Sequence, residues 1–118
     1  MNKNTLTIKK YWNSGADLVF EVGEGFLLKD SIKGTVRITR LTVYRKPDKH
    51  STRINMFAQL RNRGLGFFEV ILTRDRYADS GQFLSRTTYT FTDVGVESLY
   101  MRDNREELTL ICSGYTEK

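Results

Sequence analysis

Apolar and polar residues alternate with a period of two along much of the chain, and this pattern limits the fold more than any other feature. Leu6 and Ile8 begin the alternation, and Leu18, Phe20 and Val22 repeat it. A period of two places successive side chains on opposite faces of a strand, and no long stripe with helical spacing competes with it. The sequence therefore predicts an all-β protein.

Short turn sequences divide the chain into about eight short strands. Turns rich in glycine, asparagine, aspartate or proline fall at residues 23–25, 47–50, 62–66, 77–81 and 103–105. This spacing is typical of an antiparallel β-sandwich or a small β-barrel. Residues 93–102 leave room for one short helix, although Gly95 and the nearby valines favour a strand. With no linker or repeat in 118 residues, we predict a single β domain over 1–118.

The clearest predicted unit is a hairpin over residues 35–61 with residues 47–50 as its loop. Val36 and Ile38 share one parity in the first strand, whereas Leu41 and Val43 have the other. A strand changes parity only by inserting a residue, which predicts a β-bulge near Thr39-Arg40. The resulting register places Val43 opposite Ile54, Leu41 opposite Met56, Arg40 opposite Phe57 and Arg37 opposite Gln59.

Positive charge is concentrated in the same part of the chain. The formal net charge is +5, but residues 33–63 contain nine basic residues and one acidic residue, a net of +8. The remaining residues carry ten basic and thirteen acidic groups, a net of −3. A concentrated positive field attracts polyanions, so the basic hairpin of residues 33–63 is the leading candidate site.

The types of residue on this hairpin point to nucleic acid as the polyanion. Arginine forks bind phosphate oxygens, and aromatic faces stack on bases or on arginine. We therefore predict a non-enzymatic, nucleic-acid-binding protein. The candidate binding residues are Arg37, Arg40, Tyr44, Arg45, Lys46, Lys49, Arg53, Phe57, Arg61 and Arg63.

Other interpretations of the same residues remain open at this stage. A solvated sheet face also carries arginine, and charged side chains protect strand edges from aggregation. The second hypothesis is a small protein-protein interaction or inhibitor module, of the phage or plasmid accessory type, that docks on an acidic partner protein. The third is a β-barrel that binds a small molecule among its aromatic residues. The outward apolar pair Phe57 and Ile71 is compatible with a homodimer.

The sequence offers no set of residues typical of catalysis or metal binding. His50 is the only histidine and Cys112 the only cysteine, and they lie far apart in the sequence. A triple of Glu69, Arg53 and His50 resembles the set that some small β-rich ribonucleases use, but almost any basic protein offers such a triple. We predict no catalytic residue, no metal and no cofactor.

The first residues of the chain and its cysteine content indicate a cellular compartment. The polar start of the chain lacks the apolar region of a signal peptide, and no stretch approaches the roughly 18 apolar residues that span a bilayer. A single cysteine excludes an internal disulfide and suits a reducing compartment. The sequence therefore predicts a cytoplasmic protein without a membrane partner.

Overall fold

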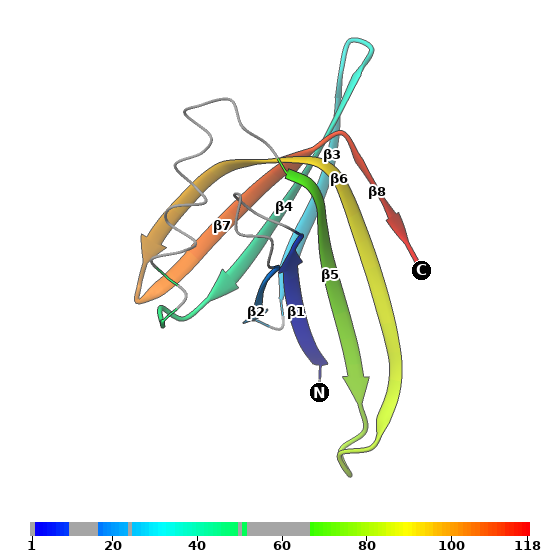
Figure 1. Cartoon of the computed structure of the whole chain (residues 1–118), viewed down its shortest axis with the longest axis vertical. Helices are drawn as coiled ribbons and strands as arrows, with labels where there is room; N and C mark the ends of the chain where they lie inside the picture. Colours follow the sequence, from blue (N-terminus) through cyan, green and yellow to red (C-terminus); the bar gives the residue numbers. More distant parts are fainter. Residues whose placement is uncertain (1, 10–16, 24, 50, 52–66) are drawn as a thin grey trace.

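The computed structural model describes residues 2–9, 17–23, 25–49, 51 and 67–118 of the chain, and these residues form eight antiparallel strands (Figure 1). The all-β prediction is confirmed, and residues 93–102 belong to a strand. The strands are β1 (Asn2–Ile8), β2 (Leu18–Val22), β3 (Phe26–Lys33), β4 (Val36–Arg45), β5 (Phe67–Tyr77), β6 (Phe83–Arg102), β7 (Arg105–Cys112) and β8 (Gly114–Glu117).

One long strand joins the two parts of the sheet. The order along the hydrogen-bonded path is β2-β1-β5-β6-β7-β4-β3, with β8 also on β6. The first part of β6 pairs with β5 and β8, the later part pairs with β7, and Asp93 with φ 53° lies between them. We call β2, β1, β5, the first part of β6 and β8 the five-stranded half, and the later part of β6 with β7, β4 and β3 the four-stranded half.

The core lies between the inner faces of the two halves. The predicted alternation of Leu18, Phe20 and Val22 is confirmed, since all three are buried while Val19 and Glu21 are exposed. Full burial of such a side chain contributes roughly 1.5–3 kcal/mol to folding. The largest fully buried side chains are Phe91, Leu6, Ile8, Leu18, Leu41, Leu72, Leu108, Leu110, Val43 and Val70.

The predicted partner of β4 is wrong. Val43 lies opposite Phe26 on one side and Leu108 on the other, and Leu41 lies between Leu28 and Leu110 in the same way. Both hydrogen-bonding edges of β4 are therefore occupied by β3 and β7 at these positions. The predicted second strand at 53–61 lies outside the described residues.

The predicted bulge near Thr39-Arg40 is also wrong, because β4 keeps one register with β3 from Val36 to Val43. Thr39 is buried and Ile38 only partly so, which gives the inner face one continuous parity. The Thr39 hydroxyl donates to Asp30 Oδ1 at 2.5 Å, so a hydrogen-bonded polar residue takes the inward position. A buried polar group is tolerated when such a partner is present.

β2, at one end of the strand path, approaches β4, the strand before the other end, at Gly23. Its amide donates to the carbonyl oxygen of Tyr44 at 2.6 Å, and its own carbonyl accepts from Asn4 Nδ2 at 2.8 Å. A Cβ at residue 23 would lie 3.1 Å from the Tyr44 oxygen, closer than most real contacts. Glycine therefore permits the close approach of β2 to β4.

Two hairpins extend from the sandwich at opposite ends of its long axis. Figure 1 shows the β3–β4 hairpin at the top and the β5–β6 hairpin at the bottom. The arrowheads of β4 and β5 and the N-terminus lie in the lower half of the view. Among the described residues, no helix is long and apolar enough to cross a membrane.

Candidate functional site

Carboxylates on neighbouring strands or turns pair with the three described arginines of the predicted binding set. Arg37 donates to Asp30 at 2.8 Å, and Arg40 Nε donates to Glu97 Oε2 at 2.7 Å. Arg45 pairs with Glu106 at 2.5 Å and with Asp48. The pairing partly neutralises the positive charge on β4, which the one-dimensional charge count could not reveal.

The remaining predicted residues do not form one cationic surface in the described part of the chain. Lys46 and Lys49 are exposed beyond the end of β4. Tyr44 lies under a guanidinium that the sequence analysis did not select, with Arg105 Cζ 4.3 Å from its ring centroid. The other candidates, together with the histidine of the considered ribonuclease-like triple, lie outside the described residues: His50, Arg53, Phe57, Arg61 and Arg63.

Asp30 links the two strands of the β3–β4 hairpin. It accepts from the Thr39 hydroxyl and from Arg37, both on the opposite strand. These two hydrogen bonds, that of Thr39 first, lower the pKa of Asp30 below its ordinary value. The carboxylate therefore stays charged at neutral pH and holds the hairpin in register.

The side chain of Arg45 is almost fully buried. Its side chain is 2% exposed and that of Glu106 is 4% exposed. The guanidinium also lies 5.2 Å from the ring centroid of Phe20, a cation–π contact. The alternation of the strand would have predicted this burial, because Arg45 follows Leu41 and Val43 at a spacing of two on the inward face. This buried ion pair links the end of β4 to β7.

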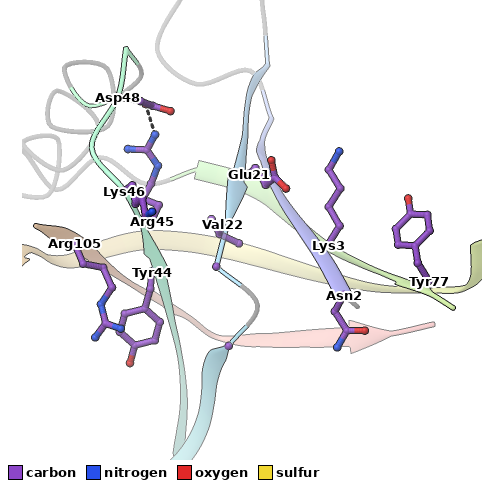
Figure 2. A pocket seen from close by; sticks show the side chains of 12 residues that line it. Asn2, Lys3, Glu21, Val22, Tyr44, Arg45, Lys46, Asp48, Tyr77 and Arg105 are labelled. Atoms are coloured by element: carbon purple, nitrogen blue, oxygen red, sulfur yellow. Dashed lines mark hydrogen bonds and ion pairs between the residues drawn. The ribbon is translucent and has the colours of Figure 1, made fainter. Parts of the chain in front are cut away.

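A hollow of about 810 Å³ lies where several strands end (Figure 2). Figure 2 shows Lys3 and Tyr77 on one side of it, and Tyr44, Arg105 and the Arg45–Asp48 pair on the other. Four basic and two acidic residues of the described part of the chain line the hollow, so it carries charges of both signs with an excess of positive ones. The lining residues are Asn2, Lys3, Glu21, Val22, Gly23, Gly25, Tyr44, Arg45, Lys46, Asp48, Tyr77 and Arg105.

Exposed apolar side chains gather near the turns of the hairpins. Ile32 and Val36 flank the β3–β4 turn, Phe83 and Leu84 follow the β5–β6 turn, and Tyr100 and Met101 precede the β6–β7 turn. Single exposed apolar residues are ordinary, but a cluster at the end of a projecting element is typical of a contact surface. The sequence analysis did not select these residues, because it paired the strand of residues 36–45 with residues 53–61 and not with β3 and β7.

The described residues contain no group of three or more His, Cys, Asp or Glu side chains placed to hold a metal ion. Cys112 is buried, and its thiol donates to the carbonyl oxygen of Thr39 at 3.6 Å. Burial raises the pKa of this thiol, which keeps it protonated. Cys112 therefore acts as a small core residue.

No family model and no curated protein matches the sequence. The fold does match solved structures of Hcp proteins over nearly the whole length of both chains. Secreted protein Hcp3 from Pseudomonas aeruginosa has a TM-score of 0.65 at 13% identity, over 100% of this chain and 97% of that one. A doubly substituted Hcp1 from the E. coli EAEC 042 pathovar has a TM-score of 0.64 at 15% identity, over 98% and 97%.

A further Hcp crystal structure gives a TM-score of 0.65 at 10% identity, over 100% of this chain and 97% of that one. The protein therefore has an Hcp-like fold. At these identities the likeness establishes the architecture of the chain, and sequence comparison alone could not have found it.

The Hcp-like fold corrects two predictions. The nucleic-acid-binding function, together with its alternatives of an acidic-partner module and a small-molecule barrel, is wrong, because the fold is that of the Hcp proteins. The cytoplasmic location is wrong as well, since the Hcp3 neighbour is a secreted protein. Of the predicted partners, nucleic acid is not supported. An oligomer of the chain is supported.

Proposed function

We propose that this protein is a secreted structural subunit that assembles into hexameric rings stacked as a tube, the role of an Hcp-type component of type VI secretion. The observation that carries the proposal is the match of the fold to Hcp structures over nearly the full length of both chains. The same likeness supports the prediction that the protein is not an enzyme.

The four-stranded half supplies the features that a ring requires. In the described residues, β3 pairs only with β4, and β6 after Val94 pairs only with β7. The two outer edges of this half are therefore open, and they lie on opposite sides of it. An open edge offers unpaired backbone donors and acceptors to another strand.

Exposed apolar side chains accompany both open edges. Leu27 is exposed on β3, and Tyr100 and Met101 are exposed on β6. Because the two edges differ, a contact between β3 of one copy and β6 of the next is heterologous, and such contacts close into a ring when the rotation between copies permits. The ring would then bury apolar surface that the single chain exposes to water.

The test is the size and shape of the purified full-length protein. We expect particles of six times the mass of the 118-residue chain by light scattering, and rings by negative-stain electron microscopy. Leu27→Glu and Met101→Lys place charges at the two edges and should each yield monomers. Val19→Glu, at an exposed position on β2 in the five-stranded half, is the matched control and should leave rings intact. A wild-type protein that stays monomeric at high concentration would contradict the proposal.

A further inference from the structure

The hollow at the strand ends combines hydrogen-bond donors and acceptors that come from different strands (Figure 2). Glu21 on β2 has a carboxylate, which only accepts hydrogen bonds, whereas Lys3 on β1 has an ammonium group, which only donates them. On the other side, Arg105 on β7 donates from a planar guanidinium. A ligand that extends across the hollow therefore meets both kinds of group.

The positive excess of the lining is offset by two carboxylates that lie behind it. Arg45 pairs with Glu106 at 2.5 Å as well as with Asp48. Arg105 Nη2 lies 3.4 Å from Glu107 Oε1. Neither Glu106 nor Glu107 lines the hollow, so a count of the lining alone overstates its positive charge. An anionic group beside Arg45 would also be repelled by the two carboxylates that already hold the guanidinium. The hollow therefore favours an uncharged ligand.

Arg45 retains one donor for such a ligand. Its Nη1 and Nη2 atoms donate to Glu106 and Asp48, whereas its buried Nε atom has no hydrogen-bond partner among the described residues. Arg45 is 5% exposed and lines the hollow. A buried donor without an acceptor costs free energy, so an acceptor at this wall is stabilising. Because the charge of Arg45 is already balanced, a neutral oxygen atom, as in a hydroxyl group, suits the position.

Aromatic rings stand on two sides of the hollow. Tyr77 lies on one side and Tyr44 on the other (Figure 2). The ring of Phe83 lies 5.8 Å from that of Tyr77, and Phe83 is 51% exposed, so the aromatic surface continues beyond the hollow. The face of an aromatic ring is partly negative and attracts the weakly positive C–H groups of a sugar ring. Such stacking holds a polar ligand without an ion pair.

We propose that the hollow binds a short chain of neutral sugar rings. Sugar hydroxyls both donate and accept hydrogen bonds, and the C–H faces of the rings can stack on the tyrosines. The volume of about 810 Å³ lies in the upper part of the range of roughly 300–1,000 Å³ for small-ligand pockets, which suits a chain of rings. This site lies at the strand ends and not in the barrel interior considered from the sequence. The inference goes beyond the proposed function, because it concerns a ligand of the chain and not its assembly.

Titration with chitotriose, a neutral chain of acetylated amino sugars, tests the site. The full-length wild-type protein is titrated by isothermal titration calorimetry, and we expect a dissociation constant below about 1 mM. Maltotriose, a neutral chain without the acetamido groups, is titrated in parallel. Saturation-transfer NMR on the same mixtures should show the sugar C–H protons in contact with the protein. If neither sugar binds at about 10 mM, ten times that limit, the proposal is overturned.

Gly25→Trp fills the hollow and assigns the binding to it. A Cβ on Gly25 meets nothing within 4 Å, so the indole enters open space, and we expect affinity at least about tenfold weaker. Gly114→Trp is the matched control, because Gly114 also has open space for a Cβ but lies on β8, outside the lining. It should bind as the wild type does. Far-UV circular dichroism checks that both variants fold. Equal affinity of the two variants would overturn the assignment to the hollow.

Salt and an acidic sugar test whether recognition is neutral. The affinity for chitotriose should change little in about 1 M salt, where the Debye length is about 3 Å. Trigalacturonate, which carries carboxylates, should bind no tighter than chitotriose. Tenfold tighter binding of the acidic sugar would show that positive charge governs the hollow, and would overturn the inference. Light scattering keeps the two proposals apart, since rings without sugar binding retain the proposed function, and sugar binding without rings retains this site.

Discussion

The two ends of β4 carry arginine–carboxylate pairs with the same chemistry and opposite surroundings. At the tip end, the Arg37 side chain is 56% exposed and its partner Asp30 is 39% exposed. At the other end, Arg45 and Glu106 are almost fully buried. An exposed pair is screened by water and contributes little, whereas removal of one partner from a buried pair leaves an uncompensated charge. β4 therefore contains one ion pair on which the stability of the fold depends, Arg45–Glu106, and one at the surface that contributes little, Arg37–Asp30.

The largest effect is expected for Arg45→Met. Glu106 would then be buried without its guanidinium, and such a loss costs about 3–5 kcal/mol in the free energy of unfolding. Urea denaturation followed by far-UV circular dichroism measures it. Adding Glu106→Leu to Arg45→Met should recover much of the stability, because an apolar pair of similar volume often replaces a buried ion pair at little cost. A single variant as stable as the wild type would contradict the importance of this pair.

An intermediate effect is expected for the pair of Asp75 and Arg86, whose side chains are 10% and 57% exposed. The two hydrogen bonds from Arg86 to Asp75 are the largest cause of a lowered pKa for this carboxyl group. Its contribution to stability is therefore full above the unfolded-state pKa of about 3.9 and is lost as the pH falls through the lower folded-state pKa.

The test of this pair is the variant Asp75→Asn. It should be less stable than the wild type at pH 7, and it should lose less stability between pH 5 and pH 2. Urea midpoints at each pH measure the difference. Asp30 also has a lowered pKa, so some acid sensitivity remains in the variant. A variant with the same pH dependence as the wild type would show that Asp75 does not contribute.

The smallest effect is expected for Arg37→Gln. The urea midpoint should stay close to that of the wild type, because both partners of the lost ion pair are in contact with water. The pKa of Asp30 should rise but stay below its ordinary value, since the hydrogen bond from Thr39 remains. An NMR titration of the Asp30 carboxyl carbon measures this shift. A destabilisation as large as that of Arg45→Met would remove the contrast between the two ends of β4.

The sequence predicts which residues face the core much better than which strands are neighbours. The alternation in β1 and β2 places Leu6, Ile8, Phe20 and Val22 in the core, as observed. The partners of β4 could not be predicted, because a period of two defines the faces of a strand and carries no information about the strands beside it. The actual partner β7 is distant in the sequence, with Thr42 and Thr109 hydroxyls meeting at 3.0 Å.

The candidate site was harder to predict than the fold. The charge count selected Arg45 as a surface residue, although its parity with Leu41 and Val43 placed it inside. The exposure of Ile32 and Val36, near the turn of the β3–β4 hairpin, could not be predicted from the sequence. Their exposure follows from the ending of β7 at Cys112, opposite Thr39, which is a property of the whole arrangement.

The change of partners along β6 near Asp93 has a mechanical consequence. One continuous strand belongs to both halves of the sandwich, with β5 and β8 beside it before Asp93 and β7 beside it afterwards. A pull on the β5–β6 hairpin therefore passes into the other half through peptide bonds, which are far stronger than contacts between side chains. The two halves therefore cannot move apart as separate plates without deforming this shared strand.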